Sequence, residues 1–340
     1  MVGMLRKQPY TKMLLQLRIL LILGLLVVAA SGQPGGASDN TENDPDHAVK
    51  VSDDVLWRLE LGDIAEVRTF RYTGAGHGAK AAPMILYSYS YIPKSLDRSR
   101  KAPLIVLIHG GVHSNNMTGG PANTATIVRE LIEQGYVVTA PDYRGSTGYG
   151  AAYARAIDYG GRENDDIVGA RDWMLQRYSF LDPARVGLLG WSHGGMIALF
   201  DIFLHPDLFA CAYAGEPVSD LIERRKYLKS MPQTMAESVG ESASKDDEEY
   251  RKRSPVTWAA KLERPLLVHG NTSDETVHVV EVQHLVEALQ AAGKQFEYKI
   301  YDAAPGGHHF NRIDTKLARE SRAEIYAFLA KYLKPAAGKP

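Results

Sequence analysis

The sequence is poor in cysteine and in net charge, and each shortage excludes a class of protein. Cys211 is the only cysteine among 340 residues, so no intramolecular disulfide can form. Its apolar surroundings, residues 208–214, predict a buried small hydrophobic residue rather than a reactive thiol. Lys and Arg number 39 against 40 Asp and Glu, a formal net charge of −1. Because no basic stripe is present, a nucleic-acid partner is not expected.

Long apolar runs are scarce as well, and the one that stands out covers residues 19–30. Basic residues precede it at positions 6, 7, 12 and 18, and two small residues, Ser31 and Gly32, follow it. This order predicts a secretory signal peptide over residues 1–32, since a bilayer span needs roughly 20 apolar residues. Residues 13–17 are also mostly apolar, so an uncleaved N-terminal membrane anchor is the alternative. Either way, the protein is expected to be exported to the periplasm or the extracellular space.

Residues 33–50 are rich in small and polar residues without a hydrophobic period, which predicts a disordered linker. Residues 51–340 are then expected to form one catalytic domain, in which apolar strand patterns alternate with helical ones. Strands are expected at 65–72, 84–92, 103–108, 136–140, 186–189, 210–214, 265–269 and 296–301. Helices are expected at 124–134, 166–178, 195–204, 279–292 and 315–333. This alternation predicts an α/β fold with a mostly parallel central sheet and helices on both faces.

The pattern changes between residues 217 and 262, where a charged stretch predicts a small helical excursion over the edge of the sheet. The charge run at 245–249 is interpreted as a solvated helix face. No internal repeat interrupts the order of strands and helices.

The sharpest local motif is Gly190-Trp-Ser192-His-Gly194-Gly195, which directly follows a buried strand and precedes a helix. This is the G-x-S-x-G nucleophile elbow of the α/β-hydrolase fold, in the context that the elbow requires. The strand must turn into the helix so tightly that side chains at the flanking glycines would clash. Ser192 is therefore the predicted nucleophile of a serine hydrolase.

A serine nucleophile needs a base and an acid that orients the base, and in this fold they follow the serine in the order acid, then histidine. The candidate acids are Asp274 and its neighbour Glu275, in the loop after the strand at 265–269. The candidate bases are His308 and His309, in the loop after the next strand. Adjacent histidines could also bind a metal, but no third ligand accompanies them at metal spacing, so no metal is expected.

An oxyanion hole is expected from the glycine-rich segment that follows the strand at 103–108. Gly111 would place its backbone N–H near the substrate oxygen, and the amide of His193, directly after the nucleophile, would supply the second donor. His109 is interpreted as a brace for this loop rather than as a proton carrier.

Taken together, these motifs resemble the catalytic domain of the prolyl oligopeptidase family of serine peptidases, from about residue 84 to residue 333. The resemblance lies in the HGG segment at 109–111, DYRGSTGYG at 142–150, DPARV at 182–186 and RSP at 253–255. The family's acid motif D-x-x-V matches residues 274–277, which favours Asp274 over Glu275. Its H-x-F motif matches residues 308–310, which favours His308 over His309.

Three features depart from the family. Its members usually carry an N-terminal β-propeller, and the region between the linker and the sheet is too short for one, so none is expected. Many members have Tyr after the nucleophile, where this chain has His193. Proline-selective members place aromatic residues after a P-V-S segment, whereas Pro217-Val-Ser219 is followed here by Asp220 and Leu221. The resemblance therefore does not extend to proline selectivity.

The leading hypothesis is a serine peptidase that cleaves short or N-blocked peptides through an acyl-enzyme intermediate, without a cofactor. A carboxylesterase acting on acyl or sugar esters is the alternative, because the same residues serve both reactions. A non-catalytic binding protein of this fold is a third, remote reading, since it predicts a broken triad. Val218, Leu221 and Val277 are the candidates for the acyl pocket. The expected partner is a small peptide or ester substrate, with no membrane partner beyond the N-terminal anchor, and the sequence predicts no oligomeric state.

Overall fold

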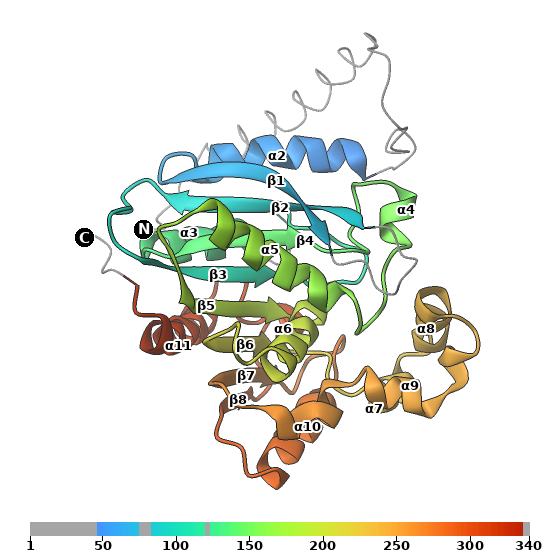
Figure 1. The fold of residues 1–340 in the computed structure, drawn as a ribbon. Helices are drawn as coiled ribbons and strands as arrows, with labels where there is room; N and C mark the ends of the chain where they lie inside the picture. Colours follow the sequence, from blue (N-terminus) through green and yellow to red (C-terminus); the bar gives the residue numbers. More distant parts are fainter. Residues whose placement is uncertain (1–45, 75–82, 120–122, 336–340) are drawn as a thin grey trace, which may run out of the picture.

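The computed structural model describes residues 46–74, 83–119 and 123–335, and its centre is one eight-stranded sheet (Figure 1). The strand order is β1-β2-β4-β3-β5-β6-β7-β8. The strands are β1 (Ala65–Gly74), β2 (Met84–Pro93), β3 (Ala102–Ile108), β4 (Val137–Asp142), β5 (Leu181–Trp191), β6 (Cys211–Gly215), β7 (Leu266–Asn271) and β8 (Glu297–Tyr301). The pairs β1·β2 and β2·β4 are antiparallel, and the others are parallel. The mostly parallel sheet predicted from the sequence is confirmed.

Helices cover both faces of this sheet, and each face has its own apolar core. On one face, α2 (His47–Leu61), α3 (Thr124–Glu133) and α11 (Lys316–Leu333) pack through one cluster of buried residues. On the other face, α5 (Glu163–Arg177), α6 (His193–Leu204) and α10 (Val279–Ala291) pack through a second cluster. Figure 1 shows α5 and α6 in front of the sheet and α3 behind it. Every residue of β3 is buried, as expected for a central parallel strand.

The excursion at 217–262 is helical, as predicted. It contains α7 (Leu221–Tyr227), α8 (Met231–Val239) and α9 (Asp247–Lys252), together with 3₁₀ turns at Ala243–Lys245 and Pro255–Lys261. Outside the excursion lie the short helix α4 (Ala151–Ala154) and a 3₁₀ turn at Gly307–His309. Met231, Met235 and Tyr250 bury their side chains in an apolar cluster with residues of α6. Residues 245–248 are exposed, which agrees with a solvated helix face.

The N-terminal helix α2 corrects the predicted linker, because residues 47–50 are helical and Lys50 is buried. The buried residues of α2 are Lys50, Asp53, Trp57 and Leu61, which recur at helical spacing but include two charged side chains. Several apolar residues of α2 instead point outward. The inward side of the helix therefore mixes two charged residues with two large apolar ones and lacks the continuous apolar stripe that marks a core-facing helix.

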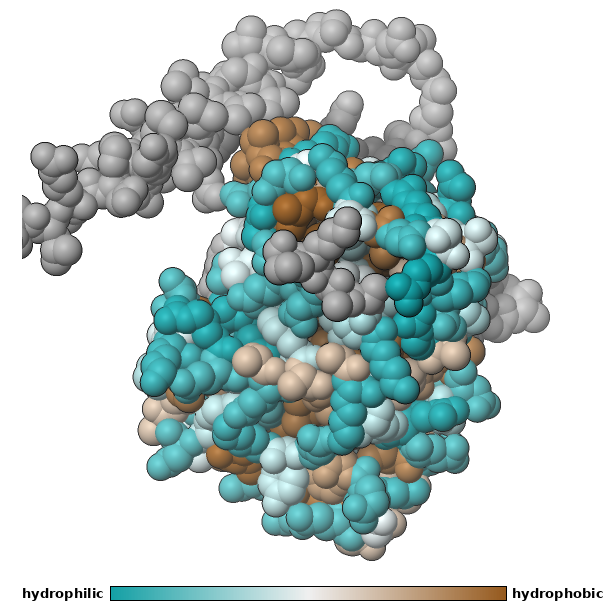
Figure 2. All heavy atoms as spheres, turned by 90° about the vertical axis from the view of Figure 1, so that its left-hand side faces the viewer, coloured by the Kyte–Doolittle hydropathy of each residue, from teal (hydrophilic) through white to brown (hydrophobic). Residues whose placement is uncertain are grey.

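The outward side of α2 is the main apolar feature of the surface. Of seven exposed large hydrophobic side chains among the described residues, four belong to this helix: Val49, Val51, Val55 and Leu59. Figure 2 shows a largely hydrophilic face with hydrophobic spheres gathered toward its top, at the height of α2 in Figure 1.

The predicted leader, residues 1–32, and most of the predicted linker lie outside the described residues. Within the described ranges, none of the helices combines the length and apolar character needed to traverse a bilayer.

Candidate active site

Ser192 stands at the sharp turn between β5 and α6, in the conformation that the elbow motif predicts. Its backbone has φ 59° and ψ −121°, a region that non-glycine residues adopt only under strain and often at functional sites. The flanking glycines are required because a side chain at either position would clash with the backbone. A Cβ on Gly190 would lie 2.2 Å from the carbonyl oxygen of Gly194, and one on Gly194 would lie 2.2 Å from that of Ile108. The turn can therefore form only without side chains at these positions.

The structure pairs His308 with Asp274, one of the two candidate acids. The loop after β7 carries Asp274, the 3₁₀ turn after β8 carries His308, and the His308 Nδ1 to Asp274 Oδ2 distance is 2.6 Å. Oδ1 of Asp274 accepts the backbone N–H groups of Thr276 at 2.8 Å and Val277 at 2.9 Å. Asp274 is buried whereas Glu275 is exposed, and the role of Asp274 as the orienting acid stays a prediction.

His309, the rival of His308, is held in another environment. Its Nδ1 is buried and has no hydrogen-bond partner among the described residues. Burial lowers the pKa of His309 to about 4, and nearby Arg312 adds to the effect. A weakly basic imidazole without a carboxylate partner is a poor candidate for the base, and the role of His308 as the base stays a prediction. The described residues contain no group of three or more metal-ligating side chains.

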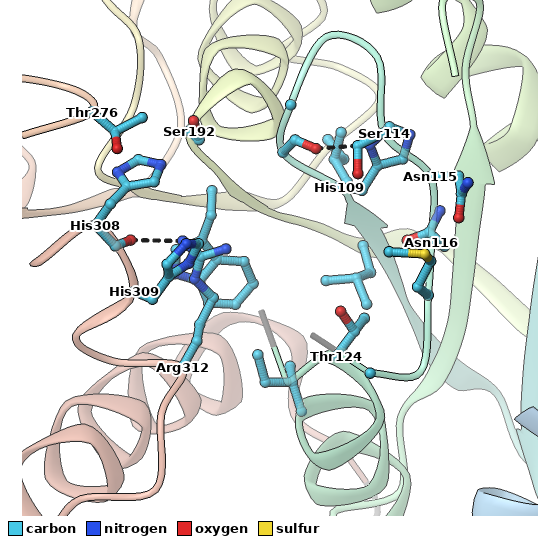
Figure 3. A pocket seen from close by; sticks show the side chains of 18 residues that line it. His109, Ser114, Asn115, Asn116, Thr124, Ser192, Thr276, His308, His309 and Arg312 are labelled. Carbon is cyan, nitrogen blue, oxygen red and sulfur yellow. Dashed lines mark hydrogen bonds between the residues drawn. The ribbon is translucent and has the colours of Figure 1, made fainter. Parts of the chain in front are cut away.

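Ser192 and His308 line one cavity of about 300 Å³. Figure 3 shows His308 and His309 on one side of it and the loop with His109, Ser114, Asn115 and Asn116 on the other. Trp191, Ile127 and Thr124 contribute to its wall, and Arg312 reaches it from the segment before α11. The cavity thus lies at the carboxyl ends of the parallel strands, where open α/β sheets place their sites.

The loop after β3 brings the predicted oxyanion glycine to this cavity. Gly111 lines it with a φ of +78°, a value that favours glycine. Gly110 packs so closely on the elbow that a Cβ there would lie 2.9 Å from the Trp191 carbonyl oxygen. The backbone of this loop therefore lies beside the nucleophile, as an oxyanion role for Gly111 requires.

His109 fits the predicted bracing role. Its Nε2 is 2.9 Å from the Ser146 hydroxyl, and its ring stacks on Tyr143 with centroids 4.2 Å apart. Burial lowers the pKa of His109 to about 4. The neutral ring links the oxyanion loop to the glycine-rich segment after β4, and its Nε2 also lies 3.8 Å from a carboxylate oxygen of Asp142.

His193 contributes its backbone at the start of α6, but its side chain turns away from the cavity. The ring is buried, 3.3 Å from a carboxylate oxygen of Glu163, and packs against Tyr159 and Tyr143. An oxyanion role for the His193 amide stays a prediction, whereas lining of the cavity by its side chain is not observed.

The three residues predicted for the acyl pocket lie together but do not line the cavity. Val218, Leu221 and Val277 are each at most 1% exposed and belong to the apolar cluster that also holds residues of α6 and α8. They occupy the other side of Ser192 from Trp191 and Ile127, which belong to the core of the α3 face. Their role in an acyl pocket stays a prediction.

The sequence interpretation missed Arg312 and its surroundings. Arg312 is 5% exposed, its Nη2 donates to the carbonyl oxygen of His308 at 2.7 Å, and its guanidinium lies over Trp191. Behind it, burial raises the pKa of the Glu216 carboxyl well above its usual range. The only local signal was a cation four residues after His308, and no period or motif distinguished it from a surface arginine.

The sheet order, the strained serine and the His308–Asp274 pair define the α/β-hydrolase fold. Residues 123–336 match the prolyl oligopeptidase family, and the chain belongs to that family. Dipeptidyl aminopeptidase BIII of Pseudoxanthomonas mexicana is 28% identical over 262 residues, covering 73% of this chain and 37% of that protein. Dipeptidyl peptidase 8 of Mus musculus is 31% identical over 286 residues, covering 80% of this chain and 30% of that protein.

Solved structures show the same fold. The uncomplexed acylaminoacyl peptidase of Pyrococcus horikoshii superposes with a TM-score of 0.68 at 22% identity, covering 82% of this chain and 43% of that one. A puromycin hydrolase superposes with a TM-score of 0.67 at 24% identity, covering 81% and 40%. This chain therefore spans less than half the length of each of these proteins.

Proposed function

We propose that the protein is a serine peptidase that hydrolyses short or N-blocked peptides through an acyl-enzyme intermediate. The observation that carries the proposal is the strained Ser192 in one cavity with His308, whose Nδ1 is 2.6 Å from Asp274. Family membership supports the peptidase over the esterase, since the relatives are named as peptidases. The presence of a serine, a histidine and an aspartate in the predicted positions also argues against a purely binding role.

Each group has one step in the proposed mechanism. Asp274 accepts a hydrogen bond from the Nδ1–H group of His308, which leaves the Nε2 lone pair to take the proton of the Ser192 hydroxyl as the oxygen attacks the carbonyl carbon. The tetrahedral oxyanion then lies near the backbone amides of Gly111 and His193, each worth roughly 3 kcal/mol of barrier. His308 returns the proton to the leaving amine, and a water molecule repeats the sequence on the acyl-enzyme.

The experiment compares the protein with its Ser192→Ala variant on matched substrates that carry one acyl group as an anilide and as a phenyl ester. The wild type should cleave anilides at rates approaching those of the esters, and the variant should cleave neither. Circular dichroism checks that the variant is folded. Cleavage of esters alone would replace the peptidase proposal by the esterase, and an unchanged rate in the variant would remove Ser192 from the mechanism.

We further propose that the protein is exported through residues 1–32. The support is the sequence order of a basic region, the apolar run at 19–30 and small residues. N-terminal sequencing of the chain recovered from the exported fraction tests the cleavage. Full-length chain in the membrane fraction would favour the anchor, and full-length chain in the cytoplasm would contradict export.

A further inference from the structure

Arg312 brings far more hydrogen-bond donors to the cavity than the protein uses. A guanidinium carries five N–H donors in a planar fork. Within the described ranges, the hydrogen bond from Nη2 to the His308 carbonyl is its one bond to a protein acceptor, and Nε is buried without a partner. Because a buried donor without an acceptor is costly, this guanidinium is suited to receive an acceptor from a ligand. Figure 3 shows Arg312 below His308, on the same side of the cavity, with its guanidinium at the His308 carbonyl oxygen.

The charge of Arg312 is also not balanced by a direct ion pair. Among the described residues, no carboxylate oxygen lies within 4 Å of its guanidinium, and none of the residues that line the cavity is acidic. Glu216 lies behind it, but burial favours the neutral acid at that position. Asp274 is the other nearby carboxylate, and its oxygens are already bonded to His308 and the Thr276 and Val277 amides.

The N-terminus of α3 faces the same cavity and adds to its positive potential. Thr124, the first residue of this ten-residue helix, lines the cavity. The first turn of α3 contains no acidic residue, and its N-cap, Asn123, makes no side-chain capping bond. The positive end of a helix dipole favours an anion, so helix and guanidinium act in the same direction. In Figure 3, Arg312 and Thr124 lie on the two sides of the lower part of the cavity.

The position of the cavity relative to Ser192 indicates which part of a substrate enters it. Its walls include Trp191 and Ile127 of the α3 face, whereas the predicted acyl residues lie on the α6 side of the serine. His308, which gives its proton to the leaving group, lines the cavity. A substrate bound across Ser192 would therefore place its leaving group beside Arg312.

We propose that Arg312 binds a carboxylate on the leaving-group side of the substrate and so selects for it. The proposal rests on the proposed peptidase function and names its substrate class. A cavity of about 300 Å³ is at the lower end of small-ligand sites, which suits a short leaving group. The carboxylate is either the free C-terminus of that leaving group or an acidic side chain within it.

The experiment uses one N-acetylated acyl peptide joined to four leaving groups: glycine, glycinamide, aspartic acid amide and asparagine amide. Two of them carry a carboxylate and each has a neutral partner. The wild type should show a kcat/KM roughly 10- to 100-fold higher for at least one acid than for its neutral partner, as a charge-assisted hydrogen bond implies. In Arg312→Gln this ratio should fall to about one. Preference for glycine identifies the C-terminus, and preference for aspartic acid amide identifies the side chain.

The ratio separates recognition from structural damage, because loss of the Arg312 bond to the His308 backbone lowers both rates together. Arg322→Gln is the matched control. Arg322 is buried and donates to the carbonyl oxygens of Asn311 and Ile313 in the same segment, but it does not line the cavity. This variant should keep the wild-type ratio even where both rates fall.

A wild-type ratio near one, or an unchanged ratio in Arg312→Gln, would overturn the role of Arg312. Cleavage of the neutral peptides by the wild type but not by Ser192→Ala would then leave the peptidase proposal standing. Failure to cleave any of the four peptides, together with cleavage of the matched phenyl ester, would contradict the peptidase proposal itself. Calorimetric binding of the intact peptides to Ser192→Ala then tests Arg312 without turnover, and equal affinity for acid and amide would overturn its role.

Discussion

The carboxylate of Asp274 is fully engaged before a substrate arrives. Two backbone amides of its own loop bind Oδ1, and the imidazole of His308 binds Oδ2. The loop thus fixes the direction of the acceptor, and the acceptor fixes which nitrogen of His308 carries the proton. This arrangement makes the tautomer of His308 a consequence of the fold around one buried residue.

Asp274→Asn should lower kcat by about four orders of magnitude while the chain remains folded, because the amide presents the wrong group to the imidazole and stabilises the wrong tautomer. The rate of anilide hydrolysis at saturating substrate measures the effect. Glu275→Gln is the control, since Glu275 is exposed, and it should change kcat less than about threefold. Equal losses in both variants would contradict the assignment of Asp274 as the orienting acid.

At the scale of the element, α2 holds one wall of the cavity. The carboxylate of Asp53 accepts from the backbone N–H of Thr118 at 3.0 Å and from its hydroxyl, and Lys50 donates to the carbonyl oxygen of Asn116 at 3.1 Å. Trp57 donates to the same carbonyl at 3.4 Å. The loop that carries Gly111 is therefore positioned by a helix from the beginning of the folded domain.

Lys50→Met should lower the free energy of unfolding by about 3–5 kcal/mol, the usual cost of leaving a buried charge without its partner. Lys50 Nζ lies 2.9 Å from Asp142 Oδ2, and both side chains are almost completely buried. Urea denaturation at neutral pH measures the change. Lys299→Met removes a pair with Glu324 that is nearly half exposed, so it should cost less than about 1 kcal/mol. Similar losses in the two variants would contradict the importance of the α2 contact.

At the scale of the whole molecule, buried titratable groups couple stability to pH in opposite directions. Burial lowers the pKa of His109 and of His269 to about 4. Between pH 6.5 and 4 the unfolded chain binds more protons at these positions, so their contribution to stability is lost as pH falls. Burial raises the pKa of the Asp201 and Glu216 carboxyls well above the usual range. Their contribution to the stability of the protein is therefore lost as pH rises.

The contribution of His269 to the pH dependence of stability can be measured with a variant. His269→Gln should be less stable than the wild type at pH 7, where the neutral histidine is well packed and close to the Ser321 hydroxyl. The difference in the free energy of unfolding between the two proteins should narrow by roughly 2 to 3 kcal/mol on going to pH 4. Only the wild type contains the buried imidazole with a pKa of about 4, which binds a proton less readily than the unfolded chain does. Urea denaturation at several pH values measures it. Parallel stability curves for the two proteins would contradict the coupling.

The sequence by itself determined the features that depend on neighbours along the chain. The elbow around Ser192, the order of Ser192, Asp274 and His308, and the strands of the parallel core follow from turn chemistry and hydrophobic period, which act over a few residues. The buried strand at 103–108 and the helical excursion at 217–262 were recognisable for the same reason. The family motifs then favoured Asp274 and His308, and the observed ion pair agrees.

Only the tertiary structure decided the features that join distant segments. Helix α2 was hidden because its inward side carries Lys50 and Asp53, whose partners Asn116 and Thr118 lie more than 60 residues away in the chain. The sequence did not distinguish Arg312 from a surface cation, whereas the fold places it over Trp191 and in the cavity that Ser192 also lines. A buried charge is stable only with partners that the fold supplies, and no local pattern of residues encodes which partners those are.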